Sequence, residues 1–221
     1  MKTHVIYQTL ERMRVVPVIA IDDVRQALPL ADALIAGGLP VAEITFRTEA
    51  AAGVIELLSK ERPDLVVGAG TVLTVDNLKR AIDCGAQFGV APGLNPKVVT
   101  AALELGFPFA PGVMTPSEVE IALDLGASVL KFFPAEAAGG LMMLSSLAGP
   151  YAHTGVKFIP TGGITPANFR EYLSQSSVLA VGGTWIAQKK DIAAGQWAGI
   201  ERNCQALRLD PDSPGRSGLV C

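Results

Sequence analysis

The sequence predicts an α/β protein whose single domain is a closed (β/α)8 barrel. Three observations support this fold class. A chain of 221 residues suits one domain. Its residues are 49% apolar but only 6% aromatic, a balance typical of buried aliphatic strands. Eight short apolar runs, which start at intervals of about 20 to 28 residues, alternate with amphipathic segments. Eight strands with helices between them are best satisfied by a closed sheet, so a doubly wound open sheet is the weaker alternative.

The apolar runs have the composition of buried parallel strands, because they are rich in Val and Ile and are bounded by Gly and Pro. The predicted strands are Val15–Ile21, Val41–Phe46, Leu65–Gly70, Phe88–Pro92, Phe109–Val113, Val129–Pro134, Lys157–Thr161 and Val178–Gly182.

Helix start and stop signals separate these runs. Five predicted helices open at residues that can cap an N-terminus, often with proline at the first helical position: Asp22-Asp23, Thr74, Asn95-Pro96, Thr115-Pro116 and Thr165-Pro166. The same five helices end at Gly37-Gly38, Gly85, Gly106, Gly126 and about Ser174, and three of these glycines suit a left-handed C-terminal cap.

The chain termini add a helix and a tail to this pattern. A helix over about Tyr7–Met13 precedes the first strand, and in a barrel it would lie against the bottom. The barrel is expected to span residues 1–208. Residues 209–221 are rich in Pro, Gly, Ser and Asp, which predicts a flexible C-terminal tail.

Charge and cysteine usage exclude several classes of partner. The net charge of −3 argues against a nucleic-acid-binding surface, which needs a basic face. We expect no membrane span, because the longest uncharged stretch, 137–156, contains paired glycines, a proline and several hydroxyls. Three widely spaced cysteines, Cys84, Cys204 and Cys221, predict a reducing, cytoplasmic compartment.

Lys131 is the first candidate for chemistry, because it lies between apolar residues in the sixth predicted strand. Active sites of such barrels lie at the C-terminal ends of the strands. Burial disfavours the charged ammonium, and a neutral amine can attack a ketone to form a carbinolamine and then an imine. A lysine at a strand end can also extend its ammonium to water, so this residue alone leaves both interpretations open.

Glu43 is the second candidate. Side chains alternate along a strand, so Glu43, Thr45 and Arg47 share one face of the second predicted strand. If that face is the barrel interior, the carboxylate can relay protons and the guanidinium can bind a substrate carboxylate with two hydrogen bonds. A purely structural Glu–Arg contact is the alternative.

Glycine pairs end the last two predicted strands, at Gly162-Gly163 and at Gly182-Gly183. Glycines let backbone N–H groups approach an anion, and barrel phosphate sites are commonly built from the loops after strands seven and eight. A helix N-terminus at Thr165-Pro166 would add its dipole. Either pair alone can simply turn a corner. Thr71, after the third strand, can contact a carboxylate or cap the next helix.

Some motifs are absent. The chain has only two histidines, His4 and His153, and neither lies in a metal-ligand pattern, so zinc-dependent aldol chemistry is not expected. No nucleophile elbow, P-loop or zinc-protease motif occurs.

Seven segments together resemble the bacterial 2-keto-3-deoxy-6-phosphogluconate (KDPG) aldolases, many of which also act on 4-hydroxy-2-oxoglutarate (KHG). In chain order they are VPVIAI, EITFRTEAA, VGAGTVLT, FGVAPGLNP, LKFFPAE, PTGGITPANFREYL and VGGTW. The resemblance runs from about Val15 to Trp185, and KFFPAE and PTGGI are its specific parts. The region near TGVKF is slightly longer than usual in the family, and residues after Leu207 do not match.

The resemblance implies a class I aldolase with a (β/α)8 barrel that needs no metal or cofactor and is typically a homotrimer. The implied reaction is the cleavage of a phosphorylated keto acid to pyruvate and glyceraldehyde 3-phosphate. The resemblance also implies that Lys131 forms the Schiff base and that Glu43 is the acid/base. The other implied contacts are Arg47 and Thr71 to the pyruvate carboxylate, Thr161 to the C4 stereocentre, and Gly162, Gly163, Gly183 and Thr184 to the phosphate. Relatives commonly have Ser in place of Thr184.

Three other functions remain. One is a sibling aldolase specific for the galactonate epimer or acting mainly on 4-hydroxy-2-oxoglutarate, although the Thr161 hydroxyl favours the gluconate substrate. Another is a phosphate-binding barrel isomerase or synthase, which would not need a nucleophilic Lys131. The last is a binding protein without activity, which the combination of Lys131, Glu43, Arg47 and Thr71 argues against.

Overall fold

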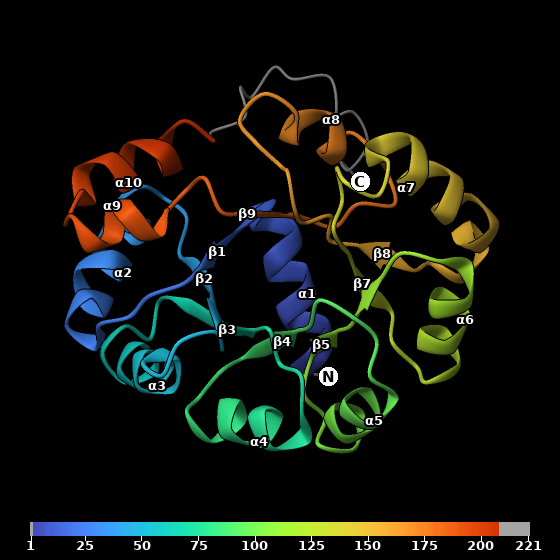
Figure 1. Cartoon of the computed structure of the whole chain (residues 1–221), viewed down its shortest axis with the longest axis horizontal. Helices are drawn as coiled ribbons and strands as arrows, with labels where there is room; N and C mark the ends of the chain where they lie inside the picture. Colours follow the sequence, from blue (N-terminus) through green and yellow to red (C-terminus); the bar gives the residue numbers. More distant parts are fainter. Residues whose placement is uncertain (1, 208–221) are drawn as a thin grey trace, which may run out of the picture.

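The computed structural model describes residues 2–207 and is a ring of parallel strands surrounded by helices (Figure 1). The strands are β1 (Val15–Ile19), β2 (Val41–Thr45), β3 (Val66–Gly70), β4 (Phe88–Val90), β5 (Phe109–Ala110), β6 (Gly112–Val113), β7 (Val129–Phe132), β8 (Lys157–Phe158) and β9 (Val181–Gly183). The helices are α1 (Lys2–Met13), η1 (Val24–Gln26), α2 (Ala27–Ala36), α3 (Ala51–Glu61), α4 (Val75–Asp83), α5 (Pro96–Glu104), α6 (Pro116–Asp124), α7 (Gly140–Ala148), η2 (Gly149–Thr154), α8 (Phe169–Leu173), α9 (Lys189–Ala193) and α10 (Trp197–Gln205).

The strands form two parallel sheets that curl toward each other. Six strands pair in the order β5-β4-β3-β2-β1-β9, and three pair in the order β6-β7-β8. Two isolated parallel bridges, Phe158 with Val178 and Thr161 with Gly182, connect the chain segment around β8 to the segment that leads into β9. The structure therefore confirms a curled parallel α/β sheet of the barrel type.

Prolines occur where two strands are shorter than predicted. The fifth predicted strand is divided into β5 and β6 at Pro111, and the seventh ends at Phe158, before Pro160. Proline has no N–H to donate to a neighbouring strand, which interrupts the regular pairing at Pro111. Around Pro160 the backbone still bonds to β7, since the Ile159 and Thr161 N–H groups donate to the Leu130 and Phe132 carbonyls at 2.8 and 2.9 Å. The last predicted strand is also displaced, because regular pairing starts only at Val181.

Local capping fixes the starts of α4, α5 and α6 where the sequence predicted them. The side chains of Thr74, Asn95 and Thr115 each accept a hydrogen bond from a backbone N–H of the first turn. At Thr115 the bond is reciprocal, because the Glu118 carboxylate accepts from the Thr115 N–H. These three helices are followed by Gly85, Gly106 and Gly126, which have φ values of +91°, +61° and +90°.

The helix predicted from Thr165-Pro166 begins later, at Phe169. The Asn168 side chain accepts a hydrogen bond from the Thr165 N–H at 2.7 Å, and this local turn replaces the first helical turn.

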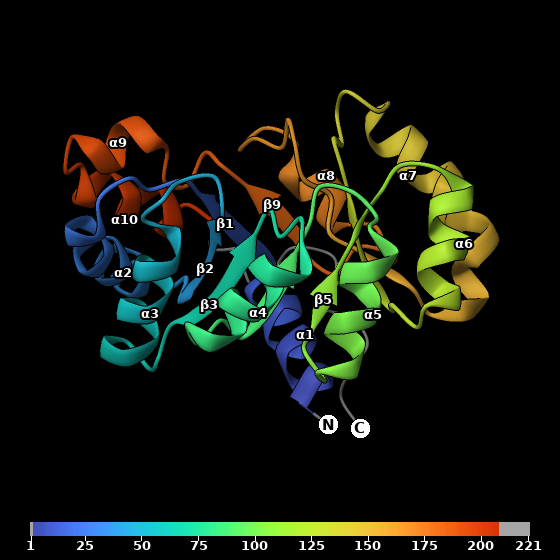
Figure 2. The same ribbon diagram turned by 60° about the horizontal axis from the view of Figure 1, so that its bottom comes forward.

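α1 lies beneath the ring of strands, as expected for a helix at the bottom of a barrel (Figure 2). Leu10 is fully buried, and the Tyr7 hydroxyl donates to the Phe109 carbonyl at 3.2 Å. The helix starts at Lys2, earlier than predicted. The predicted domain boundary between 208 and 209, and the tail beyond it, lie outside the described residues.

Candidate active site

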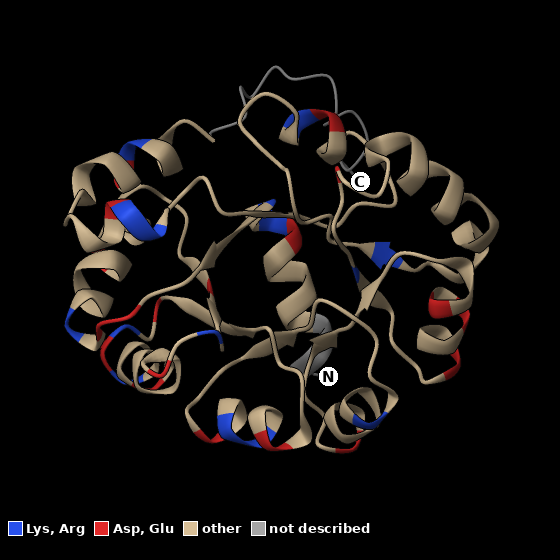
Figure 3. Cartoon of the chain, in the orientation of Figure 1, with Lys and Arg blue, Asp and Glu red and all other residues tan. Residues whose placement is uncertain are grey.

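Charged residues lie mostly on the outer helices, while few occur on the ring of strands (Figure 3). Among the described residues, the buried polar or charged side chains are Glu43, Thr45, Lys131 and Thr161. Three of them belong to strands, and Thr161 forms an isolated bridge with Gly182 beyond the end of β8. A core that contains so few polar groups makes those that remain candidates for chemistry.

Lys131 on β7 and Glu43 on β2 meet in the interior of the ring. The Lys131 Nζ atom lies 3.2 Å from Glu43 Oε1 and 3.5 Å from Oε2. Their side chains are only 7% and 4% exposed. A buried ion pair contributes little to stability, because removing both charges from water offsets their attraction. The pair therefore indicates chemistry more than structural support.

One proton can pass between these two groups. When the carboxylate holds it, Lys131 is a neutral amine with a free lone pair. When the amine holds it, Glu43 is a carboxylate that can accept a proton from a substrate hydroxyl. The arrangement thus supplies a nucleophile and an acid/base within hydrogen-bonding distance of each other.

Gly70 leaves the space that Glu43 occupies. β2 and β3 pair so that Thr45 lies opposite Gly70. A Cβ atom at Gly70 would lie 2.2 Å from Glu43 Oε1, closer than side chains tolerate. This role of Gly70 was not predicted from the sequence, although a glycine at the end of a strand is a signal for close approach.

Arg47 lies at the rim of the ring and is exposed. Its Nε atom donates to the Thr45 hydroxyl at 3.2 Å, and that hydroxyl donates to the Ile19 carbonyl at 2.8 Å. Thr45 therefore orients Arg47. This role was not predicted from the sequence, although both residues were expected on one strand face. All five residues of β2 are buried, so burial alone does not test the predicted alternation.

Thr71 follows β3 with a φ of +57°. This left-handed conformation is uncommon for a residue that is not glycine and costs most for a β-branched one, and such strain clusters at functional sites. Since β2 and β3 are neighbours, Thr71 and Arg47 follow adjacent strand ends.

The two glycine turns also lie side by side. Thr161 bridges to Gly182, and the Gly182 N–H donates to the Pro160 carbonyl at 2.8 Å. Thr161 is buried, and a Cβ atom at Gly182 would lie 2.2 Å from its hydroxyl oxygen. Gly162 and Gly163 have φ values of +99° and +80°, while Thr184 is exposed at the rim.

The predicted helix N-terminus at Thr165-Pro166 does not contribute to this site. Because α8 begins at Phe169, the Thr165 N–H is not a free helical donor but is bonded to Asn168. Neither backbone N–H of Gly162 or Gly163 has an acceptor among residues 2–207. These two groups remain as donors for an anion.

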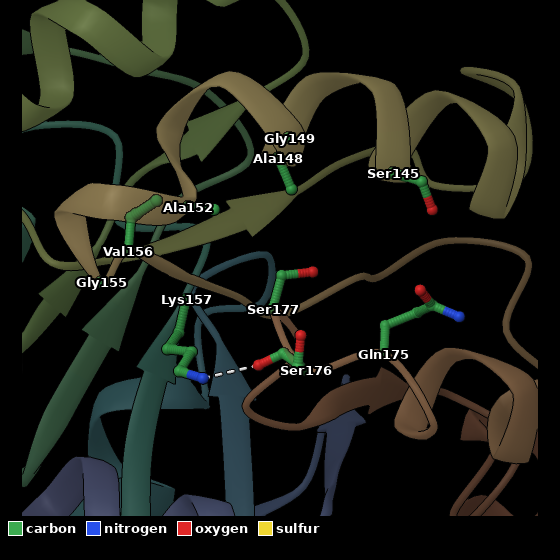
Figure 4. A pocket seen from close by; sticks show the side chains of 10 residues that line it. All are labelled: Ser145, Ala148, Gly149, Ala152, Gly155, Val156, Lys157, Gln175, Ser176 and Ser177. Atoms are coloured by element: carbon green, nitrogen blue, oxygen red, sulfur yellow. Dashed lines mark hydrogen bonds between the residues drawn. The ribbon is translucent and has the colours of Figure 1, made fainter.

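A cavity of about 270 Å³ lies at the opposite end of β8 from Thr161 (Figure 4). Its lining includes Ser145, Gln175 and Lys157, and the Lys157 ammonium donates to the Ser176 carbonyl at 2.5 Å. Barrel active sites lie where strands end, whereas Lys157 is where β8 begins. This cavity is therefore separate from the Lys131 site.

No group of three or more His, Cys, Asp or Glu residues in 2–207 is arranged to hold a metal ion. Over the same residues, no helix has the length and apolar character needed to cross a bilayer.

Comparison with known proteins gives consistent matches along most of the chain. The model of a family described as KDPG and KHG aldolase matches residues 6–203. The 2-dehydro-3-deoxy-phosphogluconate aldolase of Haemophilus influenzae is 50% identical over 200 residues, which cover 90% of this chain and 93% of the relative.

Two solved structures are similar in fold and sequence. One is the KDPG aldolase of Legionella pneumophila, with pyruvate captured at low pH as a covalent carbinolamine intermediate. It superposes with a TM-score of 0.84 and is 42% identical in sequence, and the match covers 87% of this chain and 93% of that one. The corresponding aldolase of Zymomonas mobilis, with 3-phosphoglycerate, has a TM-score of 0.82 and 41% identity and covers 90% and 93%.

Proposed function

The chain belongs to the KDPG and KHG aldolase family, and we propose that it is a class I aldolase that uses Lys131 to cleave KDPG to pyruvate and glyceraldehyde 3-phosphate. We propose that it also cleaves 4-hydroxy-2-oxoglutarate to pyruvate and glyoxylate. The observation that carries this proposal is the buried contact of 3.2 Å between the Lys131 amine and the Glu43 carboxylate.

Imine formation requires both groups. The neutral Lys131 amine adds to the C2 carbonyl of the substrate and gives a carbinolamine. Glu43 then donates a proton to the carbinolamine hydroxyl, which leaves as water, and the protonated imine remains.

Cleavage follows from the positive charge of that imine. Glu43, now a carboxylate, accepts the proton of the C4 hydroxyl. The C3–C4 bond breaks, its electron pair moves toward the imine, and the aldehyde departs. The resulting enamine is protonated at C3, and water hydrolyses the imine to release pyruvate and the Lys131 amine.

The residues around the pair account for substrate orientation. Arg47, held by Thr45, and Thr71 are the proposed ligands of the pyruvate carboxylate. Thr161 is the proposed contact that distinguishes configuration at C4. The proposed phosphate ligands are the two glycine turns, through Gly162, Gly163, Gly183 and the Thr184 hydroxyl.

We further propose that the two curled sheets form one closed (β/α)8 barrel, which the bridge between Thr161 and Gly182 supports. We also propose a metal-independent homotrimer. The metal-independent chemistry is supported by the Lys131–Glu43 pair, which can supply both the electron sink and the proton relay. The trimer rests on the family alone.

Covalent trapping tests the function. Incubation with pyruvate followed by borohydride should reduce the imine to a stable adduct on the peptide that contains Lys131. Lys131→Ala should form no adduct. Lys157→Ala, at the opposite end of the neighbouring strand β8, is the matched control and should form it as wild type does.

Absence of the adduct in folded wild-type protein would exclude the aldolase mechanism and favour a phosphate-binding isomerase or synthase. An adduct in the wild type together with cleavage of the galactonate epimer in preference to KDPG would instead identify the sibling aldolase.

A further inference from the structure

One face of α8 contacts both glycine turns and the loop after β7. Its N-cap residue and two of its own residues make these contacts. Asn168 contacts the Gly163 turn, Phe169 packs against Trp185 with ring centroids 5.9 Å apart, and Tyr172 contacts Glu136. Trp185 follows the second glycine pair, and a Cβ atom at Gly183 would lie 2.2 Å from its ring. α8 therefore connects the segments that surround the proposed phosphate subsite.

Asn168 fixes the chain on either side of Ile164. Its Nδ2 atom donates to the Gly163 carbonyl at 3.2 Å, while its Oδ1 atom accepts from the Thr165 N–H at 2.7 Å. Because the Gly163 carbonyl is held from outside, the plane of the peptide that follows it has a defined orientation. One amide side chain thus sets the direction of the Ile164 N–H, the backbone donor that follows those of Gly162 and Gly163.

Tyr172 acts on the same turn through Glu136. The Tyr172 ring is buried, with 1% exposure, and its hydroxyl donates to Glu136 Oε1. The Glu136 N–H in turn donates to the Gly162 carbonyl at 3.0 Å. A Cβ atom at Gly163 would lie 2.5 Å from Glu136 Cβ, so the turn packs directly on the Glu136 side chain.

The Glu136 carboxylate needs this partner because it lies close to a turn proposed to bind a dianion. A carboxylate free to approach that anion would repel it. The Tyr172 hydroxyl holds the carboxylate beside Gly140 instead, since a Cβ atom at Gly140 would lie 3.3 Å from Glu136 Oε1 and 3.4 Å from the Tyr172 hydroxyl oxygen.

We propose that Asn168 and Tyr172 are positioning residues of the phosphate subsite, and that they set the preference of the enzyme for phosphorylated over non-phosphorylated keto acids. The inference rests on the proposed function, because it assumes that Gly162 and Gly163 bind the substrate phosphate. Neither residue touches the reacting carbons, so the chemistry at Lys131 is independent of them.

Comparison of two substrates tests the inference. Tyr172→Phe removes only a hydroxyl, and Asn168→Ala removes both contacts of the amide. Each variant should raise the KM for KDPG about fivefold, the factor that corresponds to the net contribution of one hydrogen bond. The kcat for KDPG, both constants for 4-hydroxy-2-oxoglutarate, and the yield of the pyruvate adduct should stay at wild-type values.

Tyr7→Phe is the matched control, because it removes a tyrosine hydroxyl that is hydrogen-bonded to the Phe109 carbonyl beneath the ring. Its KM values for both substrates should equal those of the wild type. Melting temperatures of all three variants separate loss of the subsite from loss of the fold, since unfolding lowers activity on both substrates equally.

An equal change for the two substrates in both variants, or no change in KM for KDPG, would overturn the inference while the aldolase function stands. Failure of the wild type to trap pyruvate and to cleave KDPG would reject the proposed function, and the inference with it.

Discussion

Replacement of Gly70 by alanine should displace the carboxylate of Glu43, the proposed acid/base, from its position beside Lys131. The added Cβ atom would lie 2.2 Å from Glu43 Oε1 and 2.8 Å from both Cδ and Cγ, whereas ordinary contact begins at 3.4 Å. The carboxylate must therefore retreat by about 1.2 Å. Its side chain is only 4% exposed, so that movement takes place within the interior of the protein.

A misplacement of about 1 Å in a catalytic group can lower the rate by about 100-fold. We therefore expect Gly70→Ala to reduce kcat for KDPG cleavage by about that factor, and to reduce the free energy of unfolding by about 1–3 kcal/mol through overpacking. Steady-state cleavage and denaturant unfolding measure the two effects separately. Slower formation of the pyruvate adduct on Lys131 should accompany the loss of kcat.

Gly149→Ala is the control for this experiment, because no atom lies within 4 Å of the added Cβ and the residue has helical φ and ψ of −51° and −53°. It should keep wild-type kcat. If Gly70→Ala cleaves KDPG at the rate of the control, then Glu43 is not held in place by the close approach of β3, and the reasoning is wrong.

Three further results are expected. Glu43→Gln should lower kcat by about 10²–10⁴-fold, because the amide cannot relay protons, and a wild-type rate would reject Glu43 as the acid/base. Burial raises the pKa of the Glu118 carboxyl, but the hydrogen bonds from Met114 and Thr115 outweigh it and hold the pKa below its ordinary value of 4.5. The Glu118 carboxylate therefore stabilises the fold above about pH 4.5, and this stabilisation is lost as pH falls through the lower pKa of the folded state. Glu118→Ala should reduce the free energy of unfolding by about 1 kcal/mol at pH 7, and by less in unfolding titrations at acid pH. A reduction that does not depend on pH would contradict this. Burial raises the pKa of the Cys204 thiol to about 12. An alkylating reagent at pH 8 should therefore modify Cys204 only after the protein unfolds, as measured by peptide mass analysis. Equal labelling of the folded protein would refute its burial.

Capping shows which parts of the fold were predictable. Asn95 and Thr115 cap α5 and α6 at the positions predicted, because each cap is a hydrogen bond between residues that lie two or three positions apart. α8 differs because the same kind of local bond, between Asn168 and Thr165, competes with the helix and delays its start to Phe169. A sequence pattern indicates both outcomes equally and does not decide between them.

The division of the fifth predicted strand has a similar origin. Pro111 is compatible with an extended chain, so the apolar run Phe109–Val113 predicts one strand. Whether a strand continues past a proline depends on which neighbour would have accepted its missing N–H. Here β5 pairs with β4 and β6 pairs with β7, so the two halves join different sheets.

The sequence by itself indicated most of the strands and the capped helices, the face that Glu43 and Thr45 share, and the unusual place of Lys131 in an apolar strand. These properties depend on residues close together in the chain. Only the tertiary structure decided that Lys131 and Glu43, which are 88 positions apart, lie 3.2 Å from each other. It also assigned Gly70 to the space beside Glu43, and Asn168 and Tyr172 to the glycine turn. Such contacts depend on how the strands curl around a common interior, because that curvature alone brings side chains from separate strands to one point.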